Sequence, residues 1–111
     1  MSNAQFVIVV ESNGTVYGHD FVSPENVDAL LDGTVPSSGR DSFTLGDAEW
    51  FYTPTSTGDH NDTAAQGAMR IDPGFYTLPN LAGTVVIVTN DEDEFNELNT
   101  ELGELGSLLA M

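Results

Sequence analysis

The sequence contains no cysteine and no lysine, and Arg40 and Arg70 are its only arginines. The absence of cysteine excludes a disulfide framework, a thiolate zinc site and thiol chemistry. No apolar run approaches the roughly 20 residues of a membrane-spanning helix. The first five residues also lack the basic start of a secretory signal. We therefore expect a cytoplasmic protein that does not interact with membranes.

Negative charge is what the sequence has in excess. Its 18 Asp and Glu residues against two arginines give the 111-residue chain a formal net charge of −16. Such a surface repels nucleic acid and anionic lipid over a Debye length of about 8 Å. Spread over the roughly 6,000 Å² that a chain of this mass exposes, the acids reach about one per 330 Å². Duplex DNA carries about one charge per 100 Å². Acids gathered on one half of the surface would therefore approach half the charge density of DNA, and basic surfaces are the expected partners.

The hydrophobic pattern predicts a single α+β domain over residues 1–111, with a mainly antiparallel sheet of about five strands and one helical layer. The glycine-containing turns Asn13-Gly14 and Gly46-Asp47 each predict a hairpin. Strands are expected at 5–11, 15–21, 43–45, 48–53 and 84–89. Helices are expected at 24–32, at 63–70, and from 92 to 102 or beyond. The order of elements is therefore ββαββ(α)βα.

Capping residues predict where the helices begin and end. The first helix should stop at Gly33, and the second should follow a cap at Asp62. Asn90 or Asp91 should cap the C-terminal helix. Residues 54–63 contain no apolar side chain and are expected to form a mobile loop.

The C-terminal helix has an apolar stripe at heptad spacing. The stripe consists of Phe95, Leu98, Leu102, Leu105 and Leu109. Residues spaced 3 and 4 apart lie on one face of a helix, so this face must be buried. It can pack on the chain's own sheet or form the seam of a homodimer. Gly103 and Gly106 each weaken the last turns by about 1 kcal/mol.

Two rows of carboxylates follow the same helical period. The C-terminal acidic row consists of Glu94, Glu97, Glu101 and Glu104. The N-terminal acidic row consists of Glu25, Asp28 and Asp32. Like charges at these spacings cost about 0.2–0.5 kcal/mol per pair, and neither predicted helix contains a base to relieve them. Carboxylates about 4.5–6 Å apart along a helix also fall near the spacing of phosphates on a strand. Each row is either a solvated face or a phosphate-like site for a basic partner.

Motifs for catalysis and for cofactors are absent. The sequence has no nucleophile elbow, phosphate-binding loop or dinucleotide fingerprint. His19 and His60 belong to no metal-ligand or triad spacing, and the acids around His60 lack the pattern of a calcium loop. We expect no enzyme activity, no cofactor and no metal site.

Three consecutive aromatic residues, Trp50-Phe51-Tyr52, lie in a predicted strand. Side chains alternate along a strand, so Phe51 points to one face and Trp50 and Tyr52 to the other. This arrangement requires either a helix on each side of the sheet or an exposed aromatic patch.

The two acidic rows and the shortage of bases resemble the small acidic DNA-mimic inhibitors of phages and plasmids. The resemblance rests on size and charge pattern, because such inhibitors share no fold. It implies an inhibitor that occupies the groove of a restriction enzyme, a CRISPR effector or another basic DNA- or RNA-binding protein in the host cytoplasm. The seven residues of the two rows would then stand in for phosphates.

Salt adaptation is the rival explanation for the charge. A halophilic or viral accessory domain would carry excess acid without any partner, and acids such as Asp41, Asp59 and Asp72 do lie in predicted loops. Halophilic chains usually keep several arginines, whereas this one has two. The sequence leaves both explanations open.

Overall fold

The computed structural model describes residues 5–22, 24–35, 40–46, 48–53, 60–71 and 81–109, and the side chains of most of them. These residues form five strands and three helices in the predicted order, which confirms the α+β class. The strands are β1 (Gln5–Val10), β2 (Val16–Val22), β3 (Asp41–Leu45), β4 (Ala48–Tyr52) and β5 (Val85–Thr89). The helices are α1 (Pro24–Thr34), α2 (Asp62–Ile71) and α3 (Glu92–Leu109).

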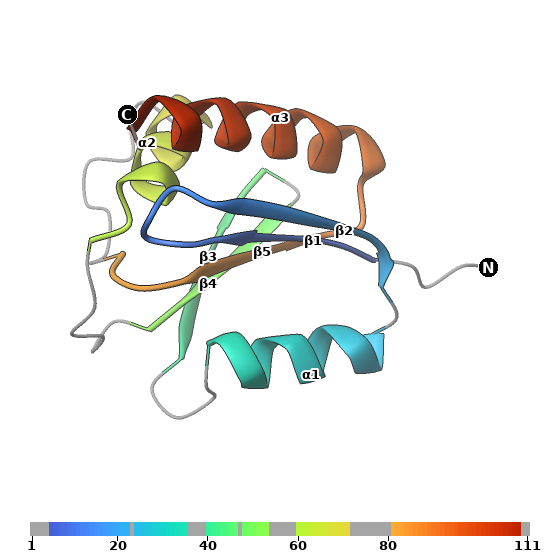
Figure 1. Ribbon diagram of the computed structural model, residues 1–111. Coiled ribbons are helices and arrows are strands. Elements are labelled where there is room, and N and C mark those ends of the chain that lie inside the picture. The colour runs from blue at the N-terminus through green and yellow to red at the C-terminus, as the bar shows by residue number, and fades with distance from the viewer. Residues whose placement is uncertain are drawn as a thin grey trace.

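The five strands form one antiparallel sheet in the order β2-β1-β5-β4-β3. Figure 1 shows α2 and α3 on one face of this sheet and α1 on the other. The prediction of one helical layer was therefore wrong, because the described helices form two.

The strand β1 explains why both faces need cover. Its residues are apolar at consecutive positions, so the side chains that alternate across the sheet leave an apolar surface on each face. Phe6 and Ile8 join the larger core beneath α2 and α3, which also contains Leu102. Val7 and Val9 join a smaller core beneath α1.

The aromatic strand β4 follows the predicted alternation. Trp50 and Tyr52 are buried in the core beneath α2 and α3, and Phe51 packs against the core beneath α1. Trp50 stacks on Phe43 of the neighbouring strand with ring centroids 5.7 Å apart. Its indole Nε1 is buried and has no hydrogen-bond partner among the described residues. These rings form part of two cores with helices on either side.

The two hairpins turn by different means. At the second, Leu45 pairs with Ala48 across a two-residue turn, and Gly46 has the positive φ of 60° that the sequence predicts. The first has a longer loop, in which the Glu11 N–H donates to the Thr15 carbonyl and the Gly14 N–H donates to the Glu11 carbonyl. Gly14 has φ 94°, as in three-residue hairpin loops that end in a left-handed residue. The hairpin predicted at Asn13-Gly14 is therefore confirmed, with residues 12–14 as its loop.

Two helix ends differ from the prediction. Gly33 lies inside α1, which continues to Thr34. Asp62 is the first residue of α2, and Asn61 is the cap, because its Oδ1 accepts the Ala64 N–H at 3.0 Å. The Asn61 side-chain amide also donates to the carbonyls of Val10 and Gly83, so this fully buried side chain ties α2 to the sheet.

The expected mobile loop 54–63 lies largely outside the described residues. Its last four residues are described. His60 forms a β-bridge with Ala82, Asn61 is buried, and the next two residues open α2.

Candidate functional site

The outer face of α3 is set by how this helix begins and packs. Asp91 caps it, and its Oδ1 accepts the N–H groups of Asp93 at 3.0 Å and Glu94 at 3.3 Å. The described side chains of the apolar stripe are buried within the chain. They are Phe95, Leu98, Leu102 and Leu105. These four residues of the stripe therefore pack within the chain, whereas the side chain of Leu109 lies outside the described residues.

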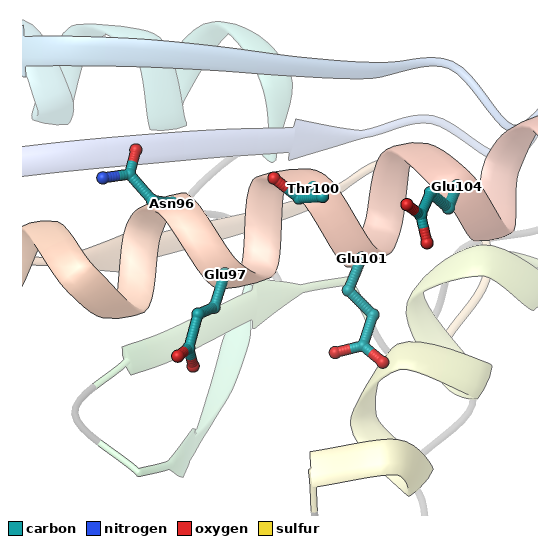
Figure 2. A pocket seen from close by; sticks show the side chains of 5 residues that line it. All are labelled: Asn96, Glu97, Thr100, Glu101 and Glu104. Atoms are coloured by element: carbon teal, nitrogen blue, oxygen red, sulfur yellow. The ribbon is translucent and has the colours of Figure 1, made fainter.

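The face of α3 opposite the apolar stripe carries most of the C-terminal acidic row. Glu97 and Glu104 are exposed, and Glu101 is half-buried between them. Together with Asn96 and Thr100 they line a shallow depression of about 490 Å³. Figure 2 shows Glu97 and Glu101 extending to one side of the helix and Asn96 to the other. The row thus continues over two helical turns beside uncharged hydrogen-bonding groups.

Glu94 departs from this row. A Cβ placed on Gly46 would lie 2.8 Å from Glu94 Oε1, so this carboxylate is folded against the turn between β3 and β4. The exposed Asp93 lies one turn before Glu97, at a separation of four residues. Asp93 is therefore the outward carboxylate at the start of the row.

Glu101 makes an ion pair with α2. The Nη1 atom of Arg70 lies 3.2 Å from Glu101 Oε1, and the two side chains are 50% and 42% exposed. Such an exposed pair stabilises the fold by at most about 1 kcal/mol. It nevertheless places a positive charge at the centre of the row.

The N-terminal acidic row lies on α1 and contains a similar ion pair. Glu25 and Asp28 are exposed, and Asp32 Oδ1 lies 3.6 Å from the Nη1 atom of Arg40. The same Nη1 donates to the Val35 carbonyl at 3.2 Å, and the guanidinium lies 5.7 Å from the centre of the Phe51 ring. Arg40 therefore joins the end of α1 to β4 as well as pairing with an acid.

The structure does not bring the two rows together. α1 and α3 lie on opposite faces of the sheet, so the rows face away from each other (Figure 1). The accessible surface is 6126 Å², close to the value expected from mass. The seven row residues are therefore divided between the two helices on opposite faces of the sheet.

Other polar groups are isolated from these rows. His60 Nε2 lies 3.4 Å from Asp62 Oδ1 at the start of α2, and His19 is exposed on β2. Among the described residues, no three His, Asp or Glu side chains are arranged to hold a metal ion. A second depression of about 310 Å³ at the end of the sheet contains one carboxylate, Glu49, which accepts the Ser42 hydroxyl at 2.8 Å. Within the described ranges, no helix has both the length and the apolar character of a bilayer span.

Comparison with protein families, with curated proteins and with solved structures found no match to this chain.

Sequence reasoning identified the carboxylates but missed their partners. The contact between Arg70 and Glu101 spans 31 residues, and no local spacing indicates it. Asn96 and Thr100 do have a signal in the sequence, because their separation of four places them on one stripe beside the glutamates.

Proposed function

We propose that this protein is an acidic inhibitor that occupies the basic nucleic-acid-binding groove of a DNA- or RNA-processing protein, with the C-terminal acidic row facing that groove. The observation that carries the proposal is the outer face of α3, where Asp93, Glu97, Glu101 and Glu104 follow one another at helical spacing. Among the described residues, Arg70 is the only cationic side chain that pairs with them.

A helix face of this kind presents negative charge at regular intervals, as a nucleic-acid strand does. Successive carboxylates rise about 4.5–6 Å along the axis. The net charge of −16 steers the protein towards basic surfaces and away from nucleic acid and anionic membranes. The target is a host protein in the cytoplasm, and inhibition requires neither catalysis nor a cofactor.

Salt adaptation remains the second candidate, and one observation favours it. The two acidic rows lie on opposite faces of the molecule (Figure 1), as expected if charge is distributed for solvation. A halophilic or viral accessory domain would use both rows equally and would need no partner.

Competition with DNA tests the proposed function. The immobilised protein is exposed to a lysate of its source cells, and captured proteins are eluted with duplex DNA at constant ionic strength. We expect nucleic-acid-binding proteins to be released by the duplex, because both ligands need the same groove. A captured protein that binds the duplex and this chain together would contradict the proposal.

Two triple variants identify the row that is used. The first carries Glu97→Gln, Glu101→Gln and Glu104→Gln, and the second carries Glu25→Gln, Asp28→Asn and Asp32→Asn. Each changes the formal net charge from −16 to −13, and each includes one acid that is paired with an arginine. We expect the first to weaken binding of the captured protein by about one to two orders of magnitude and the second to have far less effect.

The same variants separate the two candidate functions. Equal losses in the two triple variants would show that total charge alone matters. If neither triple variant binds the captured protein more weakly, then neither row contributes to binding. Melting curves should show both folds intact, since removing like charges from a helix relieves repulsion.

A further inference from the structure

Arg70 brings a guanidinium to the centre of the proposed binding face. It projects from the last turn of α2, and its Nη1 atom lies 3.2 Å from Glu101 Oε1. Glu101 lines the depression of about 490 Å³ on α3 between Glu97 and Glu104. Glu101, which has an acid on each side, is thus the carboxylate of this face that pairs with an arginine of the same chain.

The pair is positioned so that another cation can exchange with it. Both side chains are about half exposed, so water and salt screen their attraction. The neighbouring Glu97 and Glu104 lie one helical turn away on either side, at axial rises of about 6 and 4.5 Å. An incoming arginine can therefore contact Glu101 beside two further carboxylates, whereas Arg70 has an ion pair with Glu101 alone among the described residues.

We propose that Arg70 is an intramolecular competitor for this site: its guanidinium holds Glu101 in the free protein, and an arginine of the partner's groove displaces it on binding. The inference rests on the proposed function and adds the chemistry of the contact, which is guanidinium to carboxylate. It also assigns a cost to binding, because the intrachain pair must open first.

Arg40 provides a matched control. Arg40→Gln and Arg70→Gln each change the formal net charge from −16 to −17, and each frees one acid of one row. The freed acids, Asp32 and Glu101, lie on opposite faces of the sheet (Figure 1). The two variants therefore have the same total charge and differ in where it is exposed.

A hexa-arginine peptide titrated into isotopically labelled protein measures both faces in one sample, from the backbone amide shifts of α1 and α3. We expect Arg70→Gln to tighten binding about two- to fivefold at the α3 amides and to leave the α1 amides nearly unchanged. Arg40→Gln should leave the α3 amides nearly unchanged. Equal tightening at α3 in both variants would overturn the inference, because net charge alone would explain it.

A double-mutant cycle keeps the test valid if Arg40→Gln destabilises the fold through its contacts with Val35 and Phe51. In a Glu101→Gln background, Arg70→Gln should no longer tighten the α3 site, because its competitor role acts through that carboxylate. A gain that persists in this background would contradict the inference. A role limited to joining α2 to α3 would lower the melting temperature of Arg70→Gln without changing peptide affinity.

This outcome is independent of the DNA-competition experiment. One outcome is that the peptide results follow the expectation while duplex DNA fails to release the captured proteins. In that case Arg70 competes for an arginine-binding site, and the inhibitor function is wrong. If captured proteins are released by DNA but both arginine variants behave alike at α3, the inhibitor function stands and the competitor role of Arg70 is wrong.

Discussion

The helix on one face of the sheet, α1, and the helices on the other, α2 and α3, approach the strands differently. Around α3 the chain comes so close that glycine is needed at position 106, because a Cβ there would collide with the backbone carbonyl oxygen of Gly14. A Cβ on Gly67 of α2 would meet the end of the Leu102 side chain, which would have to shift. On α1, a Cβ on Gly33 would meet nothing within 4 Å. Side chains such as Val27 and Leu31 hold α1 to the sheet, whereas α3 also touches the first hairpin through backbone atoms.

The same two faces differ in how densely they are charged. α3 and its cap contain seven acids, whereas α1 contains three. Among the described residues, each of these two helices has one acid paired with an arginine, Glu101 with Arg70 and Asp32 with Arg40. The helix with the closer packing is therefore also the one with more unrelieved repulsion. The packing contacts of α3 therefore hold this helix in place despite the repulsion between its carboxylates.

Glycine-to-alanine substitutions test the packing difference and should give the largest effect. We expect Gly106→Ala to lower the free energy of unfolding by about 1–3 kcal/mol, because the new methyl group would collide with the Gly14 carbonyl. Chemical denaturation measures the change. Gly103→Ala on the same helix and Gly33→Ala on α1 meet nothing within 4 Å and should stabilise by about 0.5–1 kcal/mol. If Gly106→Ala resembled these controls, the close contact between α3 and the first hairpin would be wrong.

Salt dependence tests the difference in charge. We expect the melting temperature to rise only modestly between about 20 mM and about 2 M KCl, as for an inhibitor that works in ordinary cytoplasm. A fold that is lost at low salt would instead favour halophilic adaptation. Neutralising Glu97, Glu101 and Glu104 should flatten this dependence more than neutralising Glu25, Asp28 and Asp32, because α3 carries the denser charge. Equal flattening would show that the two faces repel alike.

The sequence predicted the order of elements because the signals that set it are local. Period-2 and heptad patterns, the Gly46 turn and the cap of α3 each depend on a few neighbouring residues. The second helical layer was missed although β1 is apolar at consecutive positions. A strand with two apolar faces needs cover on both, so this signal was present.

What the sequence could not predict depends on contacts between distant residues. The hydrogen bonds from the Asn61 amide to Val10 and Gly83, the contact of Glu94 with the Gly46 turn and the pair of Arg70 with Glu101 all join segments far apart in the chain. The spacing of the acids predicted that each row lies on one face of a helix. Their separation onto opposite sides of the sheet depends on how the helices are placed around the sheet, which no local spacing indicates. The candidate site was therefore predictable as a set of carboxylates and not as a surface.

The smallest expected effect concerns the ionisation of two tyrosines on opposite faces of the sheet. Their titration measures how well each face excludes water. Tyr52, in the core beneath α2 and α3, is 6% exposed, and burial raises its pKa above the ordinary value, with a further contribution from the charge of Asp41. Tyr17 pairs with Val9 on the α1 face and is 50% exposed. The negative charge of Glu11 is the main cause of its raised pKa.

The sign of the pH effect is the same for both phenols, but its consequence differs. A pKa raised in the folded state means that folding favours the protonated phenol, so the stabilisation is complete below the unfolded pKa of about 10 and is lost as pH rises through the folded pKa. For Tyr52, burial disfavours the phenolate in the folded state, so we expect phenolate absorbance to appear together with loss of circular dichroism in a titration from about pH 9 to about pH 12. Tyr52→Phe should move this unfolding to higher pH at a cost of less than about 1 kcal/mol near neutrality. Tyr17→Phe should remove one phenol that titrates reversibly in the folded protein and should shift the unfolding pH less than Tyr52→Phe does. A Tyr52 phenolate that forms while the fold stays intact would show that the α2 and α3 face admits water as readily as the α1 face.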